Sequence, residues 1–152
     1  IFSPPDPTLM TPDHVLVPLD GSPLADDALS HALELFDCRI TVLNVVTPLD
    51  AGMTEGGILE PDESREREAR KRAERLVENA EERAAAADRT VQTVTGTGDP
   101  AETILEFVAD HDVGHVVMGG HGGERSGIVE RLLGTVATAV VSGADVTVTV
   151  VR

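Results

Sequence analysis

Tryptophan and tyrosine are absent from this 152-residue chain, and cysteine occurs once, at Cys38. Without a second cysteine no disulfide can form within the chain, and a reducing compartment is the simplest interpretation. We expect Cys38 to be a small buried apolar side chain, with a redox role as the lesser alternative. No apolar run approaches the ~20 residues that span a bilayer, and no charged-then-apolar leader opens the chain. These absences predict a soluble, cytoplasmic protein with no membrane partner.

Positive charge is also scarce. The chain has 12 Lys and Arg residues against 27 Asp and Glu, which gives a formal net charge of -15, and Lys71 is its single lysine. Such a surface repels nucleic-acid phosphates and anionic lipids, so we expect no nucleic-acid partner. An acidic, lysine-poor composition with 2% aromatic residues is similar to that of proteins from organisms that keep molar salt in the cytoplasm. We therefore expect a halophilic protein.

The length and the 41% hydrophobic residues fit one ordinary domain with a substantial core. Met10 stands shortly before the first apolar run of the chain. We interpret residues 1–9 as an expression remnant or a disordered arm, and residues 10–152 as the domain.

Short apolar runs alternate with amphipathic segments along the domain. Strands are predicted at His14–Leu19, Arg39–Val46, Thr90–Thr95, His115–Met118 and Asp145–Val151. Helices are predicted from Pro23 to about Phe36, from Pro61 to about Ala87, from Pro100 to about Asp110, and after the glycine cluster that follows the fourth strand. Ser22 and Asp99 are predicted N-caps, because each precedes a proline at the first helical position.

Strands that alternate with helices predict an α/β fold with a single open five-stranded parallel sheet, doubly wound by right-handed crossovers. We favour the strand order 3-2-1-4-5, because an Asp-Gly-Ser turn follows the first strand and a glycine cluster follows the fourth. Ligands of such sheets bind beyond the carboxyl ends of the strands, where the strand order reverses. Both turns would then flank one crevice between the first and fourth strands.

The glycine cluster lies in the segment VVMGGHGGERSGIVERLLGTV, from Val116 to Val136. Glycines let the backbone approach an anion and direct N–H groups at it, and a helix N-terminus adds roughly half a positive charge. Glycine-rich turns between a strand and a helix are also common without a ligand, and here the apolar spacing continues in helical register across Gly134. The pattern alone leaves a phosphate loop and a simple turn both open. It is not a P-loop, because no Gly-Lys-Ser/Thr follows the glycines.

The chain resembles the universal stress protein family over nearly all of residues 10–152. The resemblance is carried by VLVPLDGS from Val15, TVLNVV from Thr41, TGDPAETI from Thr97, VVMGGHG from Val116, LLGTVA from Leu132 and the terminal VTVTVVR. These motifs are specific together and unspecific singly. The resemblance implies a fold like that of the adenine nucleotide alpha hydrolases and, for one branch of the family, bound ATP with Mg²⁺.

That nucleotide-binding branch is marked by Gly-x-x-Gly, nine further residues, and then Gly followed by Ser or Thr. Here Gly119 and Gly122 match the first part, but eleven residues separate Gly122 from Gly134. Inside a continuous helix two extra residues would rotate Gly134 by about 200°, away from the pocket. We expect them to lie in the loop instead, among residues 123–125, where they would do little harm.

The resemblance also implies the roles of individual residues. Asp20 would face the ribose, and the backbone of Val45 would face adenine. The phosphates would be surrounded by Gly119, Gly122, Gly134 and Thr135. The other residues assigned to the pocket are Pro18, Met118, His121 and Val136.

Three further side chains near the glycines bear on phosphate binding. His121 lies inside the glycine loop, where it is either a phosphate contact or a plain loop residue. Arg125 and Arg131 are candidates for offsetting phosphate charge, although a divalent ion is the better candidate in so acidic a protein.

No arrangement typical of a catalytic site is readable. No Ser/His/Asp or Cys/His set appears, and no second carboxylate partners Asp20. His111 and His115 have the spacing of a helical metal pair, but Gly114 and the start of a strand break that geometry. We therefore predict an ATP-binding sensor or regulatory module. The alternatives are a dimeric interaction protein of the same fold without nucleotide, and an enzyme that hydrolyses ATP or transfers its adenylate.

The last predicted strand, Asp145–Val151, alternates apolar and β-branched residues at the end of the sequence. We expect it to be an edge strand with unpaired backbone groups. Pairing with its own copy about a two-fold axis would satisfy those groups, so the sequence predicts a homodimer.

Overall fold

The computed structural model describes residues 12–47, 63–121 and 133–152. Its elements are β1 (His14–Pro18), α2 (Pro23–Leu35), β2 (Arg39–Val46), α3 (Glu63–Ala86), β3 (Gln92–Thr97), α4 (Pro100–Asp110), β4 (His115–Gly119), α5 (Thr135–Gly143) and β5 (Thr147–Val151). This alternation of strands and helices confirms the predicted α/β class. Residues 1–9, interpreted above as a remnant or an arm, lie outside the described residues.

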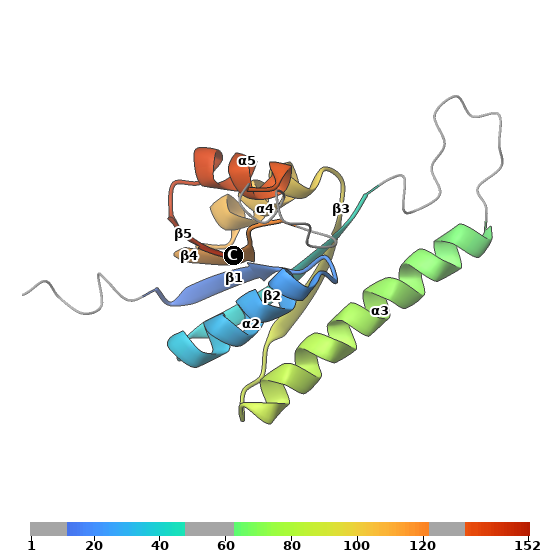
Figure 1. Ribbon diagram of the computed structural model, residues 1–152, viewed down its shortest axis with the longest axis horizontal. Coiled ribbons are helices and arrows are strands. Elements are labelled where there is room, and N and C mark those ends of the chain that lie inside the picture. Colours follow the sequence, from blue (N-terminus) through green and yellow to red (C-terminus); the bar gives the residue numbers. More distant parts are fainter. Residues whose placement is uncertain (1–11, 48–62, 122–132) are drawn as a thin grey trace, which may run out of the picture.

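The five strands form one parallel sheet in the order β3-β2-β1-β4-β5, which confirms the predicted order (Figure 1). The central strand β1 pairs with β2 on one side and with β4 on the other. From β1 the chain proceeds outward to β3 and then crosses back to β4. The strand order therefore reverses between β1 and β4, and β3 and β5 are the two edges.

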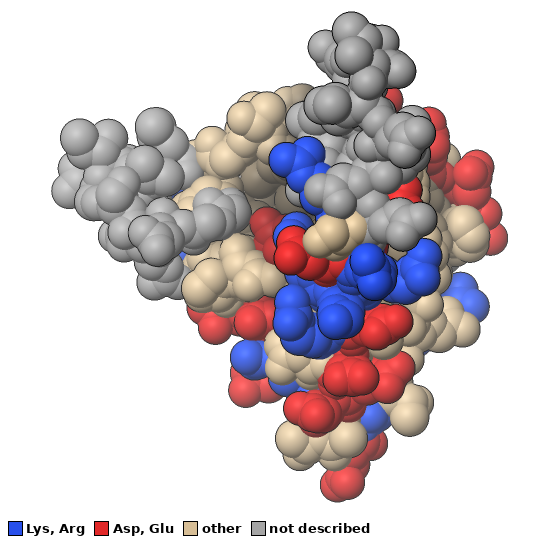
Figure 2. Space-filling model, turned by 90° about the vertical axis from the view of Figure 1, so that its right-hand side faces the viewer, with Lys and Arg blue, Asp and Glu red and all other residues tan. Residues whose placement is uncertain are grey.

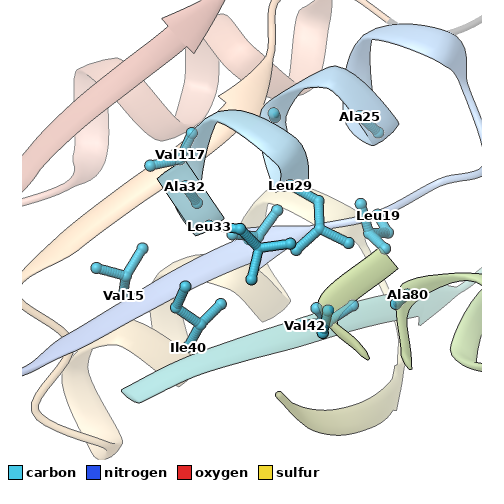
Figure 3. Close-up of a cluster of buried hydrophobic side chains, with 13 residues drawn as sticks. Val15, Leu19, Ala25, Leu29, Ala32, Leu33, Ile40, Val42, Ala80 and Val117 are labelled. Carbon is cyan, nitrogen blue, oxygen red and sulfur yellow. The ribbon is translucent and has the colours of Figure 1, made fainter. Parts of the chain in front are cut away.

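Helices cover both faces of the sheet, with α4 and α5 on one face and α2 and α3 on the other (Figure 1). Because both faces are covered, successive residues of the central strand are buried: Val15, Leu16 and Val17 are each 0% exposed. The core beneath α2 is drawn in Figure 3, where Leu29 and Leu33 point toward the strands. The core of the opposite face contains Leu16, Leu43, Ile104, Val108, Val113, Val116, Met118, Ala137 and Val140.

Both predicted N-caps are confirmed. The Ser22 Oγ accepts a hydrogen bond from the N–H of Ala25 (3.3 Å), and the Asp99 Oδ2 accepts one from the N–H of Glu102 (3.0 Å). A proline occupies the first turn of each helix. These contacts join residues three apart in sequence, so each helix start is determined locally.

The strand predicted at Thr90–Thr95 is displaced by two residues and forms β3 at Gln92–Thr97. Its pairing with β2 begins where Gln92 stands opposite Thr41. Before it, the chain turns at Asp88, whose φ is 56°. The residues between this turn and Gln92 connect α3 to the sheet.

Arg89 gives that connection a structural role. Its Nη1 donates to the carbonyl oxygens of Leu33 (3.2 Å) and Phe36 (2.6 Å), and its Nη2 donates to the carbonyl oxygen of Cys38 (2.9 Å). The last carbonyls of a helix have no partner within the helix. Arg89 therefore closes the C-terminal end of α2 from a position more than 50 residues along the chain.

The apolar spacing that continues across Gly134 does not produce a helix there. Gly134 is the N-cap of α5, with extended backbone angles (φ -66°, ψ 165°), and the helix begins at Thr135. The last strand also starts later than predicted, at Thr147. Residues 122–132, which include Gly122 and the expected place of the two extra residues, lie outside the described residues.

The most highly charged helix is α3, with the sequence ESREREARKRAERLVENAEERAAA. Figure 2 shows a face on which Lys and Arg side chains gather, with Asp and Glu side chains around them. On this helix Ala69, Ala80 and Ala84 are buried. Within the described ranges, no helix combines the length and the apolar character needed to cross a bilayer.

Candidate functional site

A cavity of about 240 Å³ opens at the carboxyl ends of β1 and β4, where the strand order reverses. Its walls come from the turn after β1, the end of β2, the start of α4, the turn after β4 and the first turn of α5. This is the crevice in which sheets of this type bind ligands.

The cavity brings together all the predicted site residues that the structure describes. They are Pro18, Asp20, Val45, Met118, Gly119, His121, Gly134, Thr135 and Val136. The remaining one, Gly122, lies outside the described residues, as do Arg125 and Arg131. The site thus assembles from segments that are distant in sequence.

The sequence did not assign several lining residues to the site. They are Leu19, Ser22, Ala25, Leu43, Pro100, Ile104 and Ala137. All but Ser22 are apolar or small. An apolar residue in a strand or helix is predicted to be in the core whether or not a cavity lies beside it, so the sequence gives no sign of these lining residues. Pro100 offered the one usable signal, because it follows a cap at the carboxyl end of the sheet.

Asp20 is held at the rim of the cavity by a local turn. Its Oδ1 accepts a hydrogen bond from the N–H of Ser22 (2.9 Å). Between them, Gly21 has a φ of 85°, and an added Cβ there would lie 3.2 Å from the Leu76 side chain of α3. The turn therefore fixes the carboxylate beyond β1, and Asp20 is the one charged residue among the described lining.

The backbone of Val45 is directed into the cavity by the lengths of the strands. The pairing of β1 with β2 ends at Pro18 opposite Leu43, and the Leu43 carbonyl still accepts from the N–H of Leu19 (2.9 Å). In a parallel strand alternate residues direct their backbone groups to the same side. The N–H and C=O of Val45 therefore point toward the side on which β1 lies, but beyond the end of β1, where no strand pairs with them. This gives a planar base a donor and an acceptor.

His121 places an unsatisfied polar atom in the site. Its side chain is 8% exposed, and its buried Nδ1 has no hydrogen-bond partner among the described residues. Beside it, the N–H of Gly134 donates to the Gly120 carbonyl (2.6 Å), which holds the start of α5 against the turn after β4. Gly134 has no side chain to cap α5. A ligand with several acceptor oxygens would satisfy both the helix N-terminus and the imidazole.

Gly119 has a packing role besides lining the cavity. A Cβ at this position would lie 3.0 Å from the backbone N of Ala25, 3.0 Å from the backbone C of Leu24 and 3.0 Å from the Leu24 Cβ. These distances are shorter than nearly all real Cβ contacts, so glycine favours the close approach of the first turn of α2 to β4. Gly119 is therefore explained by the fold without any ligand.

Two histidines outside the cavity, the buried His14 and the half-buried His115, make contacts within the sheet. The His14 Nε2 lies 2.7 Å from the Thr41 Oγ1, and its Nδ1 lies 3.0 Å from both the His111 carbonyl oxygen and the Arg39 Nη2. Burial lowers the pKa of His14 below its ordinary value. Burial likewise lowers the pKa of His115.

The two histidines with metal-like spacing are used separately. The His111 ring stacks on Phe107 with centroids 3.9 Å apart, whereas the His115 Nε2 lies 2.7 Å from the Thr149 Oγ1 and its ring packs on Phe36. Across residues 12–47, 63–121 and 133–152, no group of three or more His, Cys, Asp or Glu is placed to hold a metal ion.

A larger hollow of about 690 Å³ lies between α3 and the carboxyl ends of β2 and β3. It is lined by small and apolar residues such as Ala73 and Val77, with Glu66 and Arg70 on its α3 wall. It is an open groove, and no unsatisfied buried polar atom lies in it among the described residues. The smaller cavity is the better candidate site, because it joins convergent backbone groups, a carboxylate and an unpartnered imidazole.

Sequence comparison agrees with the fold. The model of the universal stress protein family matches residues 12–152. The universal stress protein YxiE of Bacillus subtilis (strain 168) is 30% identical over 147 residues, which cover 91% of this chain and 97% of that protein.

Solved structures show the same architecture. Universal stress protein UspA from Lactobacillus plantarum is similar with a TM-score of 0.75 and 23% identity, over 91% of this chain and 97% of that one. A universal stress protein in complex with cAMP gives a TM-score of 0.69 and 21% identity, over 93% and 98% of the two chains. With the family model matching from Pro12 to the last residue, the chain belongs to the universal stress protein family.

Proposed function

We propose that this protein binds ATP with Mg²⁺ in the cavity between β1 and β4 and acts as a sensor or regulatory module. The observation that carries the proposal is His121, which lies beside the N-terminus of α5 and has a buried, unpartnered Nδ1. The helix itself lacks a side-chain cap. An unsatisfied buried polar group costs about 1–3 kcal/mol, and a phosphate oxygen placed there would remove that cost.

The shape of the cavity supports a nucleotide. Leu43, Ile104 and Val136 give apolar walls for a base, and the backbone of Val45 offers it a donor and an acceptor. Asp20, at the rim, is suited to accept hydrogen bonds from ribose hydroxyls. At about 240 Å³ the cavity is smaller than the ~300–1,000 Å³ typical of small-molecule sites, so the outer phosphates would extend beyond it, over the start of α5. The relative in complex with cAMP supports an adenine base.

A Mg²⁺ ion held mainly by the phosphates of ATP suits this site better than a metal ion held by several protein ligands. The described lining has one carboxylate, Asp20, and one hydroxyl at the start of α5, that of Thr135. Mg²⁺ commonly keeps several waters and binds through substrate phosphates with only one or two protein groups. The ion would reduce the negative charge that ATP brings to a protein of net charge -15.

A regulatory role is favoured over catalysis. Hydrolysis requires a group that activates water near the terminal phosphate. Asp20 is the one carboxylate of the described lining, and its Oδ1 is already engaged by the Ser22 N–H. We expect ATP turnover barely above background in a phosphate-release assay, and rapid turnover would favour the enzyme alternative.

Calorimetry with Mg-ATP tests the binding proposal. Gly134→Val should weaken binding by more than tenfold, because there is little room for the new side chain: even its Cβ would lie 3.1 Å from the His121 Cα. Thr138→Ala, on the exposed outer side of α5, is the matched control and should bind as the parent does. No heat with the parent protein at low and at molar KCl, with the fold verified by circular dichroism, would contradict the proposal.

One observation favours a second candidate, a dimeric interaction protein without nucleotide. Packing against α2 is enough to explain Gly119, so the first glycine of the motif has a role without a ligand. If the purified, denatured protein releases no nucleotide and the parent binds none, this candidate replaces the first. The open edge of β5 would then be its interaction surface.

A further inference from the structure

The described part of the cavity wall has a single imidazole, that of His121. Its lining contains no Lys or Arg, and its ionisable side chains are the Asp20 carboxylate and the His121 imidazole. Among the described residues, Arg152 also lies near the histidine, because its Cγ would lie 3.3 Å from a Cβ on the adjacent Gly120. An incoming phosphate therefore meets one carboxylate and one imidazole in the cavity wall.

The imidazole is placed to respond to that phosphate. Gly134 packs directly on His121, with an added Cβ only 3.1 Å from the His121 Cα and 3.4 Å from its Cβ, so His121 lies beside the start of α5. Its Nδ1 is buried and unpartnered in the described structure. In the cationic form both ring nitrogens carry N–H groups, whereas the neutral ring has one. A phosphate oxygen near Nδ1 favours the cation by its charge and by accepting the hydrogen bond.

We propose that the protein takes up a proton at His121 when a nucleotide phosphate binds at the start of α5. The proton comes from solvent or buffer, adds to the imidazole and leaves again when the nucleotide dissociates; no covalent bond is made or broken. ATP affinity is then linked to pH, because histidine is the side chain whose charge changes in the physiological range. This inference rests on the proposed ATP binding and adds a means of regulating it.

The linkage has a definite sign and limit. Because the bound state holds more protons than the free state, affinity rises as pH falls from 8 to 6. One linked proton changes affinity by at most about tenfold per pH unit, since one unit corresponds to 1.36 kcal/mol.

Proton uptake can be measured directly by calorimetry. Mg-ATP is titrated into the parent protein at one pH in phosphate, HEPES and Tris buffers, which release different heats on losing a proton. Uptake makes the observed binding enthalpy rise linearly with the ionisation enthalpy of the buffer, and the slope is the number of protons bound. We expect a positive slope for the parent that exceeds the slope of His121→Asn.

His121→Asn is the informative variant, because its amide nitrogen stands near the position of Nδ1 and can donate without titrating. Protonation of ATP itself contributes equally to both proteins and cancels in the difference. His31→Asn, on α2 and outside the cavity, is the matched control and should keep the parent slope. His121→Gln serves if circular dichroism shows that His121→Asn is misfolded.

The outcomes separate this inference from the proposed function. ATP binding by the parent with the same slope as His121→Asn overturns proton uptake at His121 and leaves ATP binding intact. Absence of binding in every buffer overturns the proposed function, and this inference with it. A larger slope for the parent, together with an affinity that rises toward pH 6 only when His121 is present, supports both.

Discussion

Replacing Gly119 by alanine should lower the free energy of unfolding by about 1–3 kcal/mol, the usual effect of overpacking. The added Cβ would lie 3.0 Å from three atoms of Leu24 and Ala25, and two of these are backbone atoms of the first turn of α2. The Ser22 cap fixes that turn, so it cannot rotate away as a side chain can. Relief therefore requires α2 to move away from β4.

Thermal unfolding followed by circular dichroism in molar KCl measures this effect. For a domain of about this size each kcal/mol corresponds to roughly 2–4 °C, so the melting temperature should fall by roughly 2–12 °C. Gly143→Ala is the matched control. Its Cβ would meet the Leu105 Cδ1 at 2.9 Å, the far end of a side chain that can change rotamer, and alanine favours the helix. We expect its melting temperature to be unchanged or slightly raised.

An unchanged melting temperature for Gly119→Ala would refute the packing argument. Gly119 would then be required for the approach of a ligand, and Mg-ATP calorimetry on the same variant would show lost binding in a stable protein. A destabilised variant that still binds ATP when folded would instead confirm that the glycine serves the contact between α2 and β4.

Four further outcomes are expected. Arg89→Met should destabilise the fold by about 2–3 kcal/mol in urea unfolding, because three carbonyls at the end of α2 lose a charged donor; an effect under 0.5 kcal/mol would contradict this. Because burial lowers the pKa of His14, the unfolded state binds protons first and stability should fall below pH ~6.5; His14→Gln should flatten the parent's pH dependence, and an unchanged slope would argue against it. The melting temperature should rise between tens of millimolar and molar KCl, because salt screens a net charge of -15; a constant value would remove the halophile interpretation. Light scattering at micromolar concentration in high salt should give a dimer paired through β5, and a monomer would count against the edge-strand argument.

Much of this fold is determined by interactions that are local in sequence. The caps at Ser22 and Asp99 join residues only three apart, so the starts of α2 and α4 follow from short motifs. Strand and helix periodicities depend on side chains within one segment, which is why the alternation of elements was predictable. The sequence did not determine the strand order but favoured the observed one, because the Asp-Gly-Ser turn and the glycine cluster would then flank one crevice.

The resemblance, joined to this order, also predicted which residues line the cavity. Asp20 and Gly119 directly follow or end neighbouring strands, and the carboxyl ends of parallel strands lie at the same edge of the sheet. What the sequence alone determined here is therefore the set of segments that meet and the end of the sheet at which they meet.

The tertiary structure decided what each residue does there, because these contacts join segments far apart in the chain. The backbone of Val45 faces the cavity since β1 ends opposite Leu43, a consequence of strand pairing that no local pattern encodes. Arg89 closes a helix more than 50 residues away, and no pattern around Arg89 indicates this contact. In the sequence His121 is one loop histidine among several alternatives. In the structure it is buried and its Nδ1 has no partner among the described residues, since desolvation depends on every segment packed around the side chain.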